Sequence, residues 1–189
     1  MRVILASGSP RRKELLSEIG VEFEVIKAAG EEKTSAALPE EIVKELAMHK
    51  AAEVCEKVAD DEALIIAADT IVSMEGKVLG KPANQEKARE MMSMLSGKVH
   101  QVYTGVACFY HEKQMVFAEK TDVALYEMTK EEIEAYIKTK LPYDKAGGYG
   151  IQEMFGMKYV KEISGDYYNV VGLPIARLYQ QLKELGIDL

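Results

Sequence analysis

Residues 63–70 read ALIIAADT, and this stretch decides the fold class. The unbroken apolar run from Ala63 to Ala68 is typical of a strand buried on both faces, as in the centre of an α/β sheet. The run ends on Asp69 and Thr70. An acidic residue at the end of such a strand is expected at the edge of the sheet, where the sites of α/β proteins usually lie.

The segments on either side of this run alternate between strand and helix patterns. Arg2 to Ala6 predicts another buried strand, and Ser9 is expected to cap a helix that Pro10 opens and Gly20 ends. Further strands are expected over 22–26, 71–74, 77–79, 100–110, 115–125, 158–163 and 167–171. Further helices are expected over 39–58, 84–95 and 129–138, and from Pro174 onward. The pattern predicts an α/β fold with an elongated mixed β-sheet and flanking helices in two lobes around a cleft.

Composition narrows the class of protein. The chain has 189 residues and a net charge of −7, which argues against broad binding to nucleic acid. No stretch reaches the roughly 18 apolar residues that a membrane span needs, and the apolar N-terminus is too short for a signal peptide. The spacing of Cys55 and Cys108 suits neither a metal site nor a disulfide framework. The histidines, His49, His100 and His111, show no metal-ligand spacing either. We expect a cytosolic protein with small core cysteines and with histidines that are structural or exposed.

Residues 7–12, SGSPRR, lie between the first predicted strand and the first predicted helix. The start of a helix offers free N–H groups and partial positive charge, so phosphate binds there readily. Gly8 allows close approach of the backbone, and the forks of Arg11 and Arg12 suit phosphate oxygens. The alternative is a capped helix with two solvated arginines.

Asp69 and Lys50 are the next candidates. A carboxylate at Asp69 could activate water or hold a metal ion, or it could simply cap a turn. Lys50 lies on the apolar stripe of the helix predicted over 39–58, in line with Ala47 and Val54. Its ammonium either extends outward to solvent or points into a cleft toward an anion.

Three weaker motifs complete the set. Lys81 stands in a rigid Gly-Lys-Pro turn, where a solvated lysine is the default. Residues 144–152, DKAGGYGIQ, form either a flexible surface loop or a glycine-rich segment close to a ligand, and Gln152 could read the edge of a base. The acidic pair Glu31 and Glu32 is usually solvated, but it could supply a metal ligand beside Asp69.

Taken in order, these motifs resemble the Maf family, and the resemblance covers nearly the whole chain. The matching pieces are residues 5–12, 31–32, 50–51, 68–72, 80–82, 95–97, 144–152 and 172–174. The resemblance implies a single Maf-like domain over residues 1–189, with a fold similar to the house-cleaning pyrophosphatases of the inosine-triphosphate type. It also implies hydrolysis of a nucleoside triphosphate between its α and β phosphorus, with a divalent metal cation (Mg²⁺ or Mn²⁺). A homodimer is plausible on the same ground.

The roles of the residues follow from the same resemblance. Asp69 is expected to be the catalytic base and, with Glu32, a metal ligand. The expected phosphate contacts are Ser7, Arg11, Arg12, Lys50 and Lys81. Thr70 and Gln152 match the branch of the family that acts on dTTP and UTP, so they are expected to select a pyrimidine base.

Three other functions stay open on the sequence. One is a pyrophosphatase directed at purine or modified nucleotides. Another is a non-catalytic nucleotide-binding regulator of cell division and septum formation, which would not need Asp69. The third is a module that binds nucleotides without turnover. A panel of substrates separates the first alternative, and release of pyrophosphate from UTP with magnesium separates the second. Binding of nucleotide without product would support the third.

Overall fold

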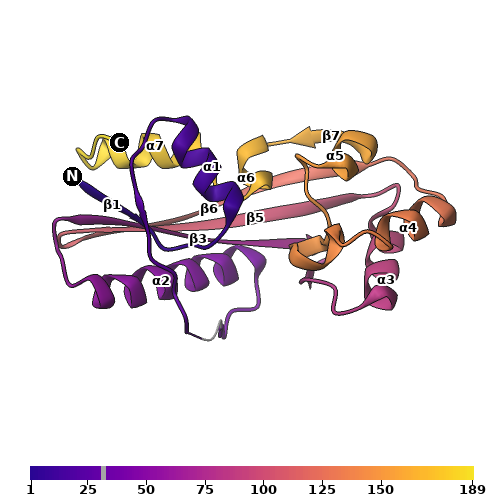
Figure 1. Cartoon of the computed structure of the whole chain (residues 1–189), viewed down its shortest axis with the longest axis horizontal. Coiled ribbons are helices and arrows are strands. Elements are labelled where there is room, and N and C mark those ends of the chain that lie inside the picture. Colours follow the sequence, from indigo (N-terminus) through magenta and orange to yellow (C-terminus); the bar gives the residue numbers. More distant parts are fainter. Residues whose placement is uncertain (31–32) are drawn as a thin grey trace. The chain divides into compact units, whose positions relative to one another are not determined.

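The computed structural model describes residues 1–30 and 33–189, which fall into two compact units (Figure 1). Unit 1 comprises Met1–Asp69, Thr104–Glu119 and Gly172–Leu189, and unit 2 comprises Thr70–Tyr103 and Lys120–Val171. Asp69 therefore ends a stretch of unit 1, and Thr70 begins unit 2.

Seven strands of the described residues form one mixed sheet in the order β2-β1-β3-β5-β6-β7, with β4 paired to β3. The strands are β1 Arg2–Leu5, β2 Glu24–Val25, β3 Ala63–Met74, β4 Lys77–Leu79, β5 Val99–Tyr110, β6 Lys113–Leu125 and β7 Val160–Ser164. β1 is parallel to β2 and to β3, whereas the β3–β4 and β6–β7 pairs are antiparallel. The predicted mixed α/β sheet with flanking helices is confirmed. The cleft between two lobes stays a prediction.

The helices of unit 1 cover its strands on both faces (Figure 1). They are α1 Pro10–Glu18, α2 Pro39–Val58 and α7 Ile175–Glu184. The buried side chains of α2, Ala47, Ala51 and Val54, form a core with residues of β1, β3 and β5. Gly105 on β5 lets α2 come close, because a Cβ built there would lie 2.2 Å from the carbonyl oxygen of Val43. Small side chains thus bring α2, and with it Lys50, directly onto the sheet.

β1 is the point at which the order of the parallel strands reverses. The chain leaves β1 through α1 to reach β2 on one side, and it returns through α2 to reach β3 on the other. Leu5 pairs with Ile66, and the amide of Ala6 donates to the carbonyl of Ile66 at 2.8 Å. In α/β sheets such a switch point, beyond the carboxyl ends of the strands, is where ligands bind. Residues 7–12 leave the sheet at this position.

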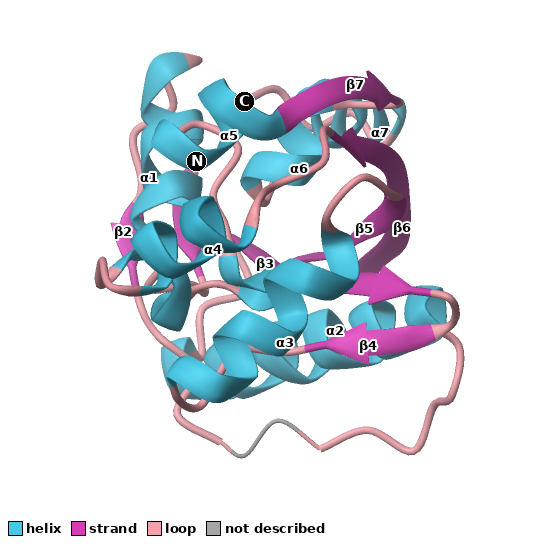
Figure 2. Cartoon of the chain, turned by 90° about the vertical axis from the view of Figure 1, so that its right-hand side faces the viewer, coloured by secondary structure: helices cyan, strands magenta, loops and turns pink. Residues whose placement is uncertain are grey.

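Unit 2 is built around a hairpin and a group of short helices (Figure 2). Glu75 and Gly76, with φ of 52° and 78°, join β3 to β4 in the left-handed region that two-residue hairpin turns require. The helical segments are α3 Gln85–Leu95, α4 Lys130–Ile137, the 3₁₀ turns η1 Leu141–Asp144 and η2 Ala146–Gly148, α5 Met154–Tyr159 and α6 Tyr167–Val171. Asn84 caps α3, and Thr129 with Glu132 forms the predicted capping box of α4.

Four local predictions are wrong. β3 continues past Asp69 to Met74, because residues 71–74 are as buried as those before them. The strand predicted over 167–171 is α6, whose start is fixed by the carboxylate of Asp166 accepting from the amide of Tyr168 at 2.7 Å. Residues 158–159 end α5, so only 160–164 form a strand. The side chain of Ser9 makes no capping hydrogen bond, because Pro10 at the first helical position already orders the start of α1.

Among the helices that the structure describes, none is both long enough and apolar enough to cross a bilayer.

Candidate functional site

Arg12 is the centre of a buried hydrogen-bond network at the end of β1. Its side chain lies on the inner face of α1, and the residue is only 9% exposed. Nε donates to the carbonyl of Gly172 at 2.8 Å, and Nη1 donates to Ser7 Oγ at 3.0 Å and to the carbonyl of Ala68 at 2.8 Å. The alternative that the sequence left open, a side chain exposed to solvent, is therefore wrong for Arg12. Its guanidinium ties the loop after β1, the strand β3 and the segment before α7 together.

Arg11 lies beside this network, half-buried in the first turn of α1. Ser7, which accepts from Arg12, also accepts from the amide of Ser9 at 3.3 Å. This bond closes a turn over residues 7–9, and Ser9 itself is extended before Pro10, so the first N–H groups of α1 follow directly on a fixed loop. The residues between β1 and α1 can therefore present backbone amides and Arg11 to an anion.

Lys27 is a cation of this region that the sequence reasoning missed. It follows β2, the parallel neighbour of β1, and its side chain lies across Gly8. A Cβ built on Gly8 would lie 2.6 Å from Lys27 Cε and 3.1 Å from Lys27 Nζ. Only the topology, which places the end of β2 beside the end of β1, reveals this neighbour. No local motif around residue 27 could have predicted it.

Asp69 and Lys50 form a largely buried ion pair. Lys50 Nζ donates to Asp69 Oδ1 at 2.6 Å, and their side chains are 18% and 11% exposed. Lys50 therefore points inward from α2, and the outward orientation is wrong. Asp69 lies within β3 and accepts from a lysine, so its role as a mere turn cap is also wrong. Ala68, the residue before Asp69, accepts from Arg12. The structure thus brings Ser7, Arg12, Lys50 and Asp69 into one connected arrangement in unit 1.

Asp69 suits one part of a metal site. A carboxylate oxygen is a ligand that Mg²⁺ prefers, and this ion is usually held by one or two carboxylates together with phosphate oxygens of the substrate. Glu32, the other expected ligand, lies outside the described residues. Among the described residues, no three His, Cys, Asp or Glu side chains gather as a metal cluster. A carboxylate such as Asp69 therefore suits a cation whose remaining ligands are oxygens of a bound phosphate.

The remaining predicted residues, Thr70, Lys81 and Gln152, belong to unit 2. Thr70 is partly buried on β3, Lys81 is exposed after β4, and Gln152 is partly buried just before α5. The glycine-rich segment, residues 144–152, contacts residues close to Thr70 and to Lys81. The amide of Gly147 donates to the carbonyl of Gly80 at 3.2 Å, and a Cβ built on Gly147 would lie 2.7 Å from Val72 Cγ2. The segment therefore packs against β3 two residues beyond Thr70 and against the turn that carries Lys81.

The glycine-rich segment is a buried part of unit 2, so the alternative of a flexible surface loop is wrong. Tyr136 Oη donates to the carbonyl of Gly148 at 2.9 Å. Tyr149 Oη shares a hydrogen bond of 2.6 Å with Nε2 of His100, which is fully buried. Burial lowers the pKa of His100 to about 4, against the opposing effect of the charge of Asp122. His100 is structural, as expected.

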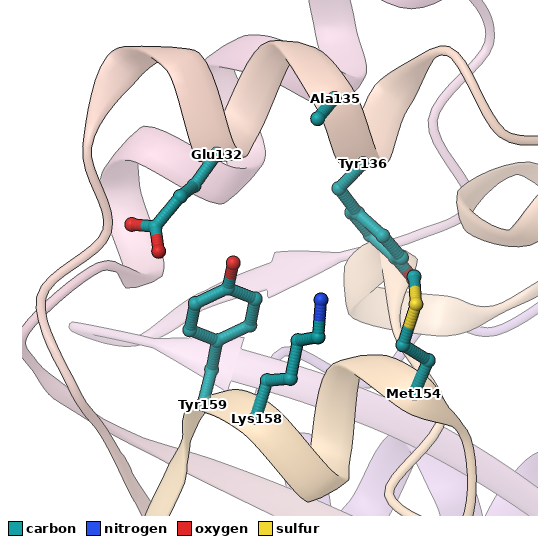
Figure 3. A pocket seen from close by; sticks show the side chains of 6 residues that line it. All are labelled: Glu132, Ala135, Tyr136, Met154, Lys158 and Tyr159. Carbon is teal, nitrogen blue, oxygen red and sulfur yellow. The ribbon is translucent and has the colours of Figure 1, made fainter.

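Unit 2 also contains an open pocket of about 430 Å³ between α4 and α5 (Figure 3). Its lining residues are Glu132, Ala135, Tyr136, Met154, Lys158 and Tyr159. Of the predicted site residues that the structure describes, none lines this pocket. Tyr136 connects the pocket with the glycine-rich segment, because its ring forms a wall of the pocket and its hydroxyl holds Gly148.

Comparison with known proteins identifies relatives over almost the full chain. A family model described as Maf-like protein matches residues 2–185. A dTTP/UTP pyrophosphatase from one strain of Bacillus cereus is 52% identical over 188 residues, which cover 99% of this chain and 97% of the relative. A dTTP/UTP pyrophosphatase of Agathobacter rectalis is 50% identical over 203 residues, covering 99% of this chain and 98% of the relative.

A solved structure of a HAM1 protein from Coxiella burnetii shares the fold. It aligns with 69% of this chain and 75% of its own, with a TM-score of 0.50 and 14% sequence identity. At this level of identity the likeness concerns the architecture of the sheet and its helices.

Proposed function

Because the chain belongs to the family of Maf-like proteins, we propose that it hydrolyses dTTP or UTP to the nucleoside monophosphate and pyrophosphate. The observation that carries the proposal is the buried pair of Lys50 and Asp69, one residue from the carbonyl that Arg12 holds. The names of the relatives support the substrate class. House-cleaning of nucleotide pools, including modified pyrimidine nucleotides, is consistent with this reaction.

The polyphosphate tail is bound by cations and backbone amides. Arg11, Arg12, Lys50 and Lys81 are proposed to share its negative charge, with Ser7 and the amides before α1 as further donors. Arg12 also has a structural role. Its hydrogen bonds to Ser7 Oγ and to the carbonyl of Ala68 fix the loop between β1 and α1 relative to β3, the strand that carries Asp69.

Asp69 is proposed to be the general base. It accepts a proton from a water molecule that attacks the α phosphorus, and the bond to the β-phosphate oxygen breaks in line, so that pyrophosphate leaves. Lys50 keeps the Asp69 carboxylate in one orientation and can stabilise negative charge as it develops on the phosphate. Phosphoryl transfer depends mainly on positioning and electrostatics, which the buried pair supplies.

A divalent cation, Mg²⁺ or Mn²⁺, is proposed to be held by Asp69 and Glu32 together with substrate oxygens. When bound, such a cation neutralises charge on the phosphates and on the leaving pyrophosphate.

Thr70 and Gln152 are proposed to select the base. A carboxamide offers both a donor and an acceptor, so it can match the edge of uracil or thymine. A site built for such hydrogen bonds rejects bases that leave its polar groups unpaired. We further propose one Maf-like domain over residues 1–189. A homodimer, a cytosolic location and the lack of nucleic-acid binding stay predictions.

A pyrophosphate-release panel tests the proposal. Wild-type protein and Asp69→Asn are assayed with UTP, dTTP, CTP and GTP, with and without Mg²⁺ or Mn²⁺. UTP and dTTP should be the best substrates, turnover should need the metal, and Asp69→Asn should lower kcat at least roughly 100-fold. Near-normal turnover by the variant would rule out Asp69 as the base. Nucleotide binding without any product would support a nucleotide-binding module without turnover instead.

A further inference from the structure

Lys145 is a buried lysine in the glycine-rich segment, and the residue is only 4% exposed. Its Nζ donates to the carbonyl of Leu141 at 2.9 Å and to Asp144 Oδ1 at 2.6 Å, and it lies 3.0 Å from Glu153 Oε1. An ammonium has three N–H donors, and these acceptors match them in number. Because a buried charge is costly unless it is paired and hydrogen-bonded, these contacts fix the position of Lys145.

Glu153 connects Lys145 to Gln152, the residue that precedes it. Its carboxylate packs onto the backbone of Gly150, because a Cβ built on Gly150 would lie 2.9 Å from Glu153 Cδ. The amide of Glu153 also donates to the carbonyl of Gly150 at 3.3 Å. Residues 150–153 therefore form a closed turn with Gln152 inside it. Lys145 holds the side chain of Glu153 at the end of that turn, and Gly150, which has no Cβ, leaves room for this side chain.

The same lysine also anchors the beginning of the segment. Through Leu141 and Asp144 it is bound to the 3₁₀ turn η1. The carbonyl of Lys145 accepts from the amide of Gly148 at 3.0 Å. The amide of Gly147, which lies between them, donates to the carbonyl of Gly80. Both ends of the stretch 144–153 thus meet at one ammonium, while its middle is fastened beside the turn that carries Lys81.

We propose that Lys145 is a positioning residue that acts through Glu153 to hold the Gln152 carboxamide in the orientation that distinguishes a pyrimidine base. The inference rests on the proposed function and names the part of the chain that sets its specificity. A carboxamide discriminates between bases only when its donor and acceptor are held in register with the base edge. Displacement of a positioned group by about 1 Å can cost on the order of 100-fold in rate.

Steady-state kinetics with UTP and GTP test the role. The variants are Lys145→Met and Glu153→Gln, with Lys158→Met, an exposed lysine of α5, as the matched control. Each test variant should lower the UTP-to-GTP ratio of kcat/KM roughly tenfold, mainly through a higher KM for UTP. The control should keep the ratio of the wild type. In a Gln152→Ala background, Lys145→Met should change the ratio no further, since both act on the same contact.

An unchanged ratio, or additive effects of Lys145→Met and Gln152→Ala, would overturn the inference. Hydrogen exchange provides a readout that does not depend on turnover. The amides of Gly147 and Gly148 should exchange at least roughly tenfold faster in Lys145→Met. Glu153→Gln, which keeps the shape of the side chain, gives the same test if Lys145→Met does not fold. Unchanged exchange refutes the positioning role, whereas a wild-type protein without pyrophosphate release refutes the proposed function alone.

Discussion

Lys50 Nζ lies 2.6 Å from Asp69 Oδ1, and both side chains are largely shielded from solvent. This pair explains why a lysine stands among Ala47, Ala51 and Val54 on the apolar face of α2. An ammonium placed there alone would be costly, and a carboxylate on the strand below it supplies the partner. A substrate phosphate that approaches Asp69 therefore also approaches Lys50.

Lys50→Met should nearly abolish pyrophosphate release. The change keeps most of the length of the side chain but removes the cation that pairs with Asp69 and that is proposed to contact the phosphates. We expect kcat/KM for UTP to fall at least roughly 100-fold, as for the loss of other preorganised donors. Lys44→Met is the matched control, because Lys44 is also on α2 but pairs with Glu40 and Glu41. If Lys50→Met and Asp69→Asn were additive when combined, the two residues would not act as a unit.

Arg11 and Arg12 should respond differently to replacement by lysine, although they are neighbours in one motif. Arg12→Lys loses the fork that reaches Gly172, Ser7 and Ala68, so we expect the free energy of unfolding to fall by about 2 kcal/mol. Arg11→Lys, at a half-buried position, should change it by less than about 0.5 kcal/mol. Urea titrations measure both values. Equal losses of stability would contradict the structural role of Arg12.

The sequence was sufficient for the parts of the fold that depend on local pattern. The apolar run of residues 63–68, the hairpin turn at Glu75-Gly76 and the capping box of Thr129 and Glu132 each identify their element. It failed where tertiary contacts decide. Residues 167–171 form a helix because Asp166 caps its start and because Asn169 donates to the carbonyl of Val102 in a buried position. The contact of Asn169 with Val102 joins residues 67 positions apart, so no local pattern contains it.

The site shows the same division. The motifs pointed to serine, arginine, lysine and aspartate side chains that the structure brings together in unit 1, whereas the chemical roles of these residues stay predictions. They did not predict the pairing of Lys50 with Asp69 or the buried role of Arg12, since these contacts link residues 19 and 160 positions apart. Lys27 escaped notice for the same reason, because its place beside Gly8 follows from the pairing of β1 with β2.

His100 should make the stability of the protein depend on pH. Its pKa falls from 6.5 to about 4 on burial, so the unfolded chain binds the proton more readily. Stability from the neutral imidazole is complete above the unfolded pKa and is lost as the pH falls from about 6.5 toward 4. Between pH 7 and pH 5 this loss should be about 2 kcal/mol. Urea unfolding at both pH values should show a smaller decrease for His100→Gln than for wild type. A His100→Gln decrease as large as that of wild type would contradict the linkage.

Lys27→Met and Gly8→Ala should weaken the binding of UTP by a similar amount. Lys27 lies across Gly8, and a Cβ on residue 8 would occupy the space of Lys27 Cε, so either change removes the ammonium from the loop. One exposed charge contact with phosphate is worth about 1 kcal/mol, so KM should rise roughly fivefold with little change in kcat.

The double variant separates this effect from a distorted loop. If Gly8→Ala acts by displacing Lys27, then Lys27→Met added to it should not raise KM further, since the ammonium has already left. Lys13→Met, on α1, is the control for the loss of a positive charge near the loop. The rise in KM should also shrink at high salt, because ions screen an exposed charge. The opposite result would be a Gly8→Ala effect that does not change with salt and that adds to the effect of Lys27→Met. It would mean that Gly8 is needed for the backbone conformation of residues 7–9 and not for the position of Lys27.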